Sequence, residues 1–197
     1  MTYKQSLQPD TLDGGGFQSQ HLFVENIKWT LRMNCLEMFA GPGYIGKALL
    51  EEGIINNLAF ADINPEAIDY CNENYPLCRT FLSDCFDNVE GQYDLIVGNP
   101  PWHRQMPYAY TYQNIQAGVT SLKAVDVDWK IHKKFFSQAL DYLTDDGIII
   151  LIESAFGSNE EVFKPMAYKH GLELFKHHYA GFIHQTEPTY FCYYRKR

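Results

Sequence analysis

The stretch that decides the fold reads Cys35-Leu36-Glu37-Met38-Phe39-Ala40-Gly41-Pro42-Gly43-Tyr44-Ile45-Gly46. Its first half is apolar enough for a short buried strand, and its second half matches G-x-G-x-x-G before a helical stretch at residues 47–52. This order predicts a strand, a glycine turn and a helix, as in the nucleotide-binding units of α/β proteins. The pattern is weak alone, because dinucleotide sites and simple connections share it.

Acidic residues follow the next two predicted strands. The second strand, residues 57–61, ends at Asp62, about twenty residues after the glycine turn, where a carboxylate can accept hydrogen bonds from both ribose hydroxyls of a nucleoside. The third, residues 79–82, ends at Ser83-Asp84, where the carboxylate can accept from an adenine amino group. The two strand ends therefore predict a site for an adenosine-containing ligand.

A stiff turn, Asn99-Pro100-Pro101-Trp102, follows the fourth predicted strand at residues 93–98. Proline has a fixed φ and no amide hydrogen, so the pair ends sheet pairing. The residue before a proline is pushed out of the helical region, which holds the Asn99 carboxamide and the Pro100 carbonyl in a defined direction. Rigid acceptors beside an aromatic ring suit an amine or amide substrate, although a turn that merely ends a strand gives the same pattern.

Together these elements resemble the class I S-adenosylmethionine-dependent methyltransferases that methylate nitrogen, over nearly the whole chain. The resemblance implies an α/β fold of the Rossmann-like kind, with a mostly parallel seven-stranded sheet, helices on both faces and a single domain. It implies S-adenosylmethionine as the cofactor, bound by Glu37, Phe39, Ala40, Gly41, Gly43, Asp62, Ile63, Asp84, Cys85 and Asn99. It also implies a catalytic part for Asn99, Pro100, Pro101 and Trp102.

Two of these residues have specific implied roles. Glu37 lies just before the glycine turn, where a carboxylate would repel a pyrophosphate but attract the cationic methionine ammonium and sulfonium. Trp102 is expected to stack on the acceptor or to face its developing positive charge. Glu37 and the proline turn also disfavour a nicotinamide dehydrogenase, and a non-catalytic binding module would not need the Asn99 acceptor.

The net charge of the chain and a closer family resemblance both limit the classes of methyl acceptor. The net charge of −8 and the pI near 5.3 argue against strong attraction to a polyanion. Residues 147–153 and 158–162, with the proline turn, look like the release-factor glutamine methyltransferases of the HemK type, which methylate a side-chain amide. The chain departs from them in lacking a preceding helical recognition domain and in having Trp102 where tyrosine is usual.

A glutamine-type amide of a protein or peptide is therefore the favoured acceptor. The alternatives are the exocyclic amine of a nucleic-acid base, namely adenine in DNA or RNA or guanine in rRNA, and a small-molecule amine. A nucleic-acid partner is disfavoured by the net charge.

Composition fits one domain in the cytoplasm. The 197 residues, 46% of them hydrophobic, can fill one core, with residues 1–34 as an N-terminal segment and residues 35–197 as the methyltransferase domain. The start has no apolar signal core, and the longest apolar run, residues 148–152, is too short to span a bilayer. The five cysteines form no C-x-x-C pair, which favours neither a disulfide framework nor a metal site.

Helical spacing predicts further helices at residues 21–31, 65–74 and 129–143, the first after a Gly14-Gly15-Gly16 hinge and the last stopped by Asp145-Asp146-Gly147. The remaining strands are expected at residues 147–152, 171–179 and 189–196. Residues 103–128 form a loop long enough to face a substrate, in which tyrosines alternate at 108, 110 and 112. That region is also locally basic through Arg104, Lys123, Lys130, Lys133 and Lys134, as a solvated helix face would be.

Overall fold

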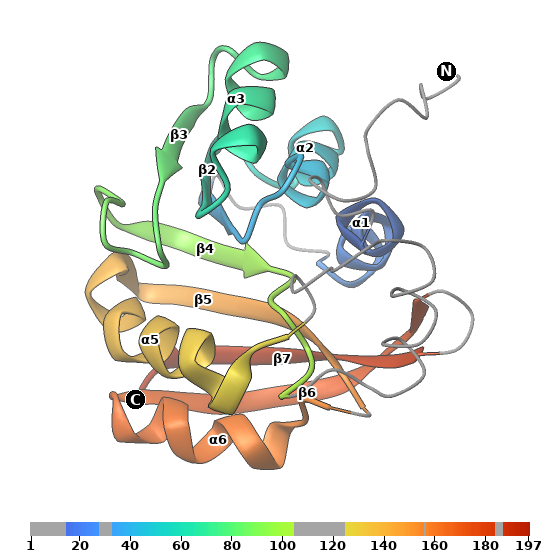
Figure 1. Cartoon of the computed structure of the whole chain (residues 1–197), viewed down its shortest axis with the longest axis vertical. Helices are drawn as coiled ribbons and strands as arrows, with labels where there is room; N and C mark the ends of the chain where they lie inside the picture. Colours follow the sequence, from blue (N-terminus) through green and yellow to red (C-terminus); the bar gives the residue numbers. More distant parts are fainter. Residues whose placement is uncertain (1–14, 28–32, 105–124, 156, 184–186) are drawn as a thin grey trace.

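One seven-stranded sheet organises the chain in a computed structural model that describes residues 15–27, 33–104, 125–155, 157–183 and 187–197. Its strands are β1 (Asn34–Met38), β2 (Asn57–Asp62), β3 (Arg79–Leu82), β4 (Tyr93–Gly98), β5 (Leu143–Ser154), β6 (Leu172–Ile183) and β7 (Glu187–Lys196). They lie in the order β3-β2-β1-β4-β5-β7-β6, and β7 alone runs in the direction opposite to all the other strands (Figure 1). The predicted mostly parallel, seven-stranded α/β fold is confirmed.

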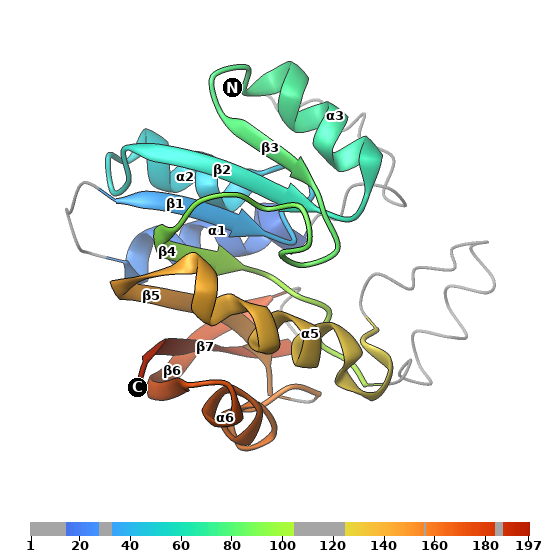
Figure 2. The same ribbon diagram turned by 90° about the vertical axis from the view of Figure 1, so that its left-hand side faces the viewer.

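Helices cover both faces of the sheet. They are α1 (Gly15–Asn26), α2 (Tyr44–Glu51), α3 (Pro65–Asn74), α5 (Lys130–Ala139) and α6 (Glu160–Lys169), with 3-10 turns η2 (Val127–Trp129) and η3 (Leu140–Tyr142). In Figure 2, α5 and α6 lie in front of the sheet, and α1 and α2 lie behind it. Within the described parts of the chain, no helix is long and apolar enough to cross a membrane.

Each face of the sheet has its own hydrophobic core, because successive side chains of a strand point to opposite faces. Cys35 and Phe60 lie in the core shared with α1, α2 and α3. Leu36 and Met38 lie in the core shared with α5 and α6. Strands β1, β2 and β4, which end at the candidate site, are thus buried on both faces, and this holds their ends in fixed positions.

The N-terminal helix lies earlier in the chain than predicted. Helix α1 contains Gly15 and Gly16, which were expected to form a hinge, and it ends at Asn26 rather than at residue 31. The Phe23 ring packs edge-on against Phe191 of β7, with 4.7 Å between ring centroids. This contact with the sheet overrides the weak helix propensity of the glycines. Helix α1 thus packs against β6 and β7.

The second half of the chain also differs from its prediction. Helix α5 ends at Ala139, and the acidic stretch expected to stop it lies inside β5, which starts at Leu143. Thr144 donates a hydrogen bond to Asp94 of β4, and the β4–β5 register shifts at this point. Helix α6 was not predicted as a helix, although Asn159 caps it by accepting from the Val162 amide. The alternating tyrosines of the 103–128 loop lie outside the described residues.

Candidate cofactor and acceptor site

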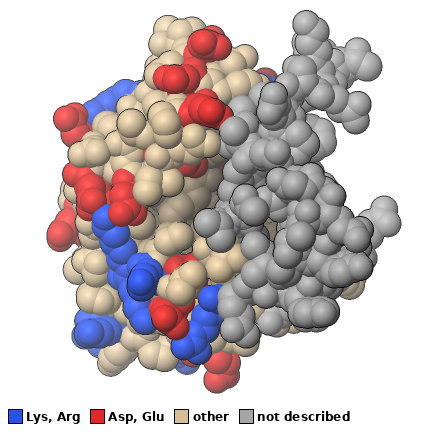
Figure 3. All heavy atoms as spheres, in the orientation of Figure 1, with Lys and Arg blue, Asp and Glu red and all other residues tan. Residues whose placement is uncertain are grey.

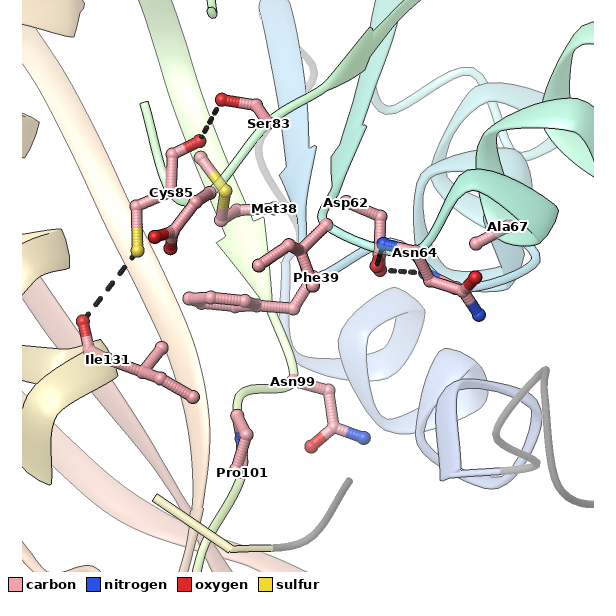
Figure 4. A pocket seen from close by; sticks show the side chains of 13 residues that line it. Met38, Phe39, Asp62, Asn64, Ala67, Ser83, Cys85, Asn99, Pro101 and Ile131 are labelled. Carbon is pink, nitrogen blue, oxygen red and sulfur yellow. Dashed lines mark hydrogen bonds between the residues drawn. The ribbon is translucent and has the colours of Figure 1, made fainter. Parts of the chain in front are cut away.

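A cavity of about 280 Å³ opens at the carboxyl ends of β1, β2 and β4 (Figure 4). It is lined by Met38, Phe39, Gly41, Asp62, Ile63, Asn64, Ala67, Ser83, Asp84, Cys85, Asn99, Pro101 and Ile131. The chain places β2 and β3 on one side of β1 and places β4 and β5 on the other. Ligands of open α/β sheets bind at such a reversal of strand order, outside the carboxyl ends of the strands.

The glycine turn after β1 is shaped by backbone conformation and by close packing. Gly41 and Gly43 have φ values of +50° and +72°, in the left-handed region that glycine adopts without strain. A Cβ on Gly43 would lie 2.6 Å from the Phe60 ring, whereas one on Gly41 would meet nothing within 4 Å. The turn therefore packs against β2 at Gly43 and is open towards the cavity at Gly41.

The β1 tip also contains a strained residue. Phe39 has a φ of +59°, an uncommon value for a residue with a side chain. Its ring lines the cavity and lies 5.8 Å from the Phe135 ring of α5, centroid to centroid. Non-glycine residues in this region gather at ligand sites, where the surrounding packing compensates for the strain.

Glu37 lies beneath the glycine turn rather than in the cavity. Its carboxylate accepts hydrogen bonds from the Ile45 amide at 3.3 Å and the Gly46 amide at 2.6 Å. These amides belong to the first turn of α2, where a negative charge is favoured by the helix dipole. Burial nevertheless raises the pKa of Glu37 to about 8, against the lowering effect of the two amides. Glu37 thus fixes the start of α2, and its contact with an ammonium group remains a prediction.

Asp62 connects the tips of β1 and β2. Its Oδ2 accepts from the Gly41 amide and its Oδ1 accepts from the Asn64 amide, each at 2.8 Å. The neighbouring Ile63 side chain is 66% exposed and lines the cavity. A carboxylate can accept about four hydrogen bonds, so these amides orient Asp62 without exhausting its capacity.

Asp84 lies at the β3 end of the cavity, beside a buried thiol. Its carboxylate accepts from Lys134 of α5 at 2.7 Å, and the same ammonium group reaches Asp87 at 2.6 Å. These two carboxylates raise the pKa of Lys134 above its usual value. Burial raises the pKa of the Cys85 thiol to about 12, so it is protonated at neutral pH. Lys134 was predicted as part of a basic region, but it neutralises acidic groups at the rim.

Asn99 offers a buried hydrogen-bond acceptor at the cavity. Its Oδ1 is buried and accepts no hydrogen bond from the residues that the structure describes. Figure 4 shows the carboxamide beside Pro101 and below the Phe39 ring. An unpaired buried polar atom costs about 1–3 kcal/mol. Oδ1 is therefore placed to accept from an N–H group that enters the cavity.

Trp102 lies in the hydrophobic core rather than among the residues that line the cavity. Its indole Nε1 donates to the Ile152 carbonyl of β5 at 2.9 Å, and the residue is only 9% exposed. The ring lies in the core on the α1 and α2 side and does not line the cavity. The ring fills a core position in this geometry, and the stacking of Trp102 on an acceptor stays a prediction. The indole anchors the proline turn to β5.

Some of the other predicted site residues line the cavity, and some lie next to it without lining it. Ala40, Gly43 and Pro100 are near the strand tips but do not line the cavity. Five lining residues were not predicted: Met38, Asn64, Ala67, Ser83 and Ile131. Ser83 adjoins Asp84 and Asn64 lies two residues after Asp62, so a wider window around each strand end would have included them. Ile131 comes from α5, and no local signal connects it with the tips of β1 and β4.

The described residues contain no group of three or more side chains that could hold a metal ion. Polar groups from separate strand ends instead surround an apolar cavity, as in many small-molecule sites.

Comparison with known proteins adds a family to this geometry. The sequence model of the methyltransferase small domain matches residues 10–124, more than half of the chain. A Methanocaldococcus jannaschii protein with the provisional name protein N5-glutamine methyltransferase is 25% identical over 177 residues, covering 84% of this chain and 85% of its own. The release factor glutamine methyltransferase of Streptococcus pneumoniae is 31% identical over 136 residues, covering 66% of this chain and 48% of its own.

A third relative has a nucleic-acid substrate in its name. The ribosomal RNA small subunit methyltransferase C of Haemophilus influenzae is 23% identical over 139 residues, covering 68% of this chain and 36% of its own. The chain therefore spans about half or less of the length of these two bacterial relatives. Among solved structures, a TehB-like SAM-dependent methyltransferase from Corynebacterium glutamicum aligns with a TM-score of 0.61 at 19% identity, covering 91% of this chain and 88% of that one.

Proposed function

We propose that this chain methylates a planar nitrogen. The premise is that it belongs to the methyltransferase small domain family and is an S-adenosylmethionine-dependent methyltransferase. We further propose that this nitrogen is a glutamine-type side-chain amide of a protein or peptide. The observation that carries the proposal is the buried Oδ1 of Asn99 at the cavity, which accepts no hydrogen bond from the described part of the chain.

The cavity residues fit the cofactor. Asp62 would accept from the ribose hydroxyls, Asp84 would face the adenine amino group, and Ile63 would cover the base. The open side of Gly41 leaves room beside the backbone for the amino acid part of the ligand. When bound, S-adenosylmethionine supplies an electrophilic methyl group on a sulfonium sulfur.

Asn99 would hold the acceptor nitrogen. An amide nitrogen is a poor nucleophile because its lone pair is delocalised, so the protein must fix its direction. Alignment of bound reactants can contribute roughly 7–11 kcal/mol, whereas a hydrogen bond to Oδ1 contributes roughly 0.5–1.5 kcal/mol. The hydrogen bond therefore serves mainly to orient the amide.

The charges near the site support a protein or peptide acceptor. Arg104 pairs with Asp128 at 3.0 Å, and Lys134 pairs with Asp84 and Asp87. On the face shown in Figure 3, described basic side chains have acidic side chains beside them. Nucleic-acid affinity depends on lysines and arginines that neutralise phosphates, and these ones already neutralise carboxylates. Base methylation remains the second candidate because of the ribosomal RNA relative.

The acceptor class can be identified by methyl transfer from radioactive S-adenosylmethionine. We expect the purified protein to label the protein fraction of a cell extract, with the methyl group located on glutamine by mass spectrometry of the digested product. Deproteinised RNA, DNA and the small-molecule fraction are tested separately. In each of them the incorporated label should not exceed the amount obtained with heat-inactivated protein. Label in RNA or DNA would replace the amide acceptor by a nucleic-acid base.

The ribose contact predicts a binding defect. Asp62→Ala should weaken S-adenosylmethionine binding at least tenfold, because hydrogen bonds to a charged group contribute about 1.5–3 kcal/mol each. Titration calorimetry measures the change, and Glu51→Ala in the exposed Lys47–Glu51 pair is the control that should bind like the wild type. Equal affinity of Asp62→Ala and wild type would contradict the assigned contact.

A further inference from the structure

Three buried side chains form a charged cluster outside the cavity. His132 lies between two carboxylates, with Nδ1 at 2.7 Å from Asp126 Oδ2 and Nε2 at 3.1 Å from Glu153 Oε1. All three residues are at most 1% exposed. Ionisable groups are almost never buried so completely unless they are paired. Neither the cofactor contacts nor the acceptor contact uses this cluster.

The three residues come from separate elements. Asp126 precedes η2 and α5, and its carboxylate accepts from the Ile131 and His132 amides at 2.8 and 3.0 Å. His132 lies on the buried face of α5, where its ring stacks on Phe163 of α6 with 4.1 Å between centroids. Glu153 lies near the end of β5. The cluster thus joins the start of α5 to the end of the strand that pairs with β4.

Each carboxylate residue lies at or next to a hydrogen bond that holds the end of the proline turn. Trp102, which ends the turn, donates from its indole to the Ile152 carbonyl, next to Glu153 in the chain. The residue after Trp102, His103, accepts from the Asp126 amide through its carbonyl at 2.8 Å. The ion cluster therefore connects the two backbone positions that hold Trp102 and His103.

The same cluster places part of the opposite wall of the cavity. Ile131, whose amide is bound by Asp126, lines the cavity opposite Asn99 and Pro101. Figure 4 shows Ile131 on the α5 side and Asn99 on the side of the turn. A shift in the cluster would therefore move both walls.

The surroundings favour a positively charged His132. Burial opposes the charge, but Glu153 and Asp126 together raise the pKa of His132 to about 9. The Cys192 and Tyr194 side chains of β7 also lie within electrostatic reach of Glu153, and Glu160 of α6 acts on the same two side chains. Burial raises the pKa of both Cys192 and Tyr194, which keeps them neutral at pH 7. Burial raises the pKa of Glu153, and the charge of His132 between the two buried acids opposes that rise.

We infer that Asp126, His132 and Glu153 act as a clasp that holds the Asn99–Trp102 turn in position for methyl transfer, with His132 as the positioning residue. This inference rests on the proposed function, because the turn is the proposed acceptor site. The clasp touches neither ligand and acts only through the ties to Trp102 and His103 and through Ile131.

The test uses the indole N–H of Trp102, which reports on the turn whether or not the acceptor is known. In ¹⁵N NMR hydrogen exchange, we expect His132→Gln to speed exchange of this proton at least tenfold. The Gly46 amide, bound by Glu37 at the start of α2, should change less than twofold. Glu153→Gln keeps an oxygen that can accept from Nε2 and removes only the charge, so it should give a smaller change in the same direction. Glu51→Gln in the exposed Lys47–Glu51 pair is the matched control, with no expected effect.

Functional readouts separate positioning from general damage. Calorimetry should give a dissociation constant for S-adenosylmethionine within threefold of the wild type for Glu153→Gln, while the single-turnover rate with the labelled protein fraction falls several-fold. Unchanged Trp102 exchange in both cluster variants overturns the clasp. A uniform rise in exchange at Trp102 and Gly46 also overturns it, because that result indicates global destabilisation. Failure of the wild type to label any protein, with the local exchange effect intact, contradicts the proposed acceptor instead.

Discussion

Asn99→Ala is expected to lower the single-turnover rate of methyl transfer by about tenfold to a hundredfold. The variant removes the buried Oδ1 acceptor at the cavity, and one or two oriented hydrogen bonds correspond to roughly 1.4–2.7 kcal/mol of barrier. Rapid-quench measurements with labelled cofactor and the identified acceptor give the rate without contributions from product release.

Two comparisons make this result specific. Asn74→Ala removes a carboxamide at the exposed end of α3, where it donates to the Tyr70 carbonyl, and it should react at the wild-type rate. Asn99→Ala should also unfold at the wild-type temperature or above it, because it removes a buried atom that has no hydrogen-bond partner among the described residues. A rate equal to that of the wild type would exclude the Asn99 carboxamide from the mechanism.

Trp102→Ala is expected to destabilise the fold by about 3–5 kcal/mol. The substitution removes a large buried side chain and leaves a cavity, and it removes the hydrogen bond to the Ile152 carbonyl. Urea unfolding monitored by circular dichroism measures the free-energy change. Trp102→Phe keeps most of the apolar volume and loses the N–H donor, so it should cost only about 1–3 kcal/mol.

The outcome distinguishes two positions of the ring. If Trp102 stacks on the acceptor, as the sequence resemblance implied, the alanine variant should fold with nearly wild-type stability and bind the acceptor poorly. If the ring occupies the core, as the structure has it, stability falls and the loss of activity follows from the displaced turn.

The sequence around each strand predicts the site residues that lie close to the end of that strand. Asp62 is the last residue of β2, Asn99 directly follows β4, and Gly41 lies three residues after the end of β1. Parallel strands bring such residues to one edge of the sheet. The cavity contains all three. Sequence patterns were sufficient here because neighbouring residues alone determine where each strand ends.

Long-range packing determines what the sequence did not predict. The direction of Trp102 depends on a carbonyl of β5 that lies 50 residues later in the chain. The contribution of Ile131 to the cavity depends on how α5 lies across the sheet. Helix α6 was missed although Asn159 and two glutamates mark its start, because Pro165 interrupts the helical pattern. The clasp could not be predicted from local sequence either, because its three residues come from separate elements and meet only in the folded structure.

The insertion of β7 between β5 and β6 has a consequence during protein synthesis. Both neighbours of β7 are made before it, so the β5 edge that pairs with residues 189–195 must wait until these have been translated. That edge includes the apolar run at residues 148–152, and an uncovered apolar strand edge is a template for pairing with another chain. Slow translation of the β6–β7 hairpin would therefore prolong the aggregation-prone stage of the nascent chain, which makes this hairpin the segment where chaperone assistance should matter most.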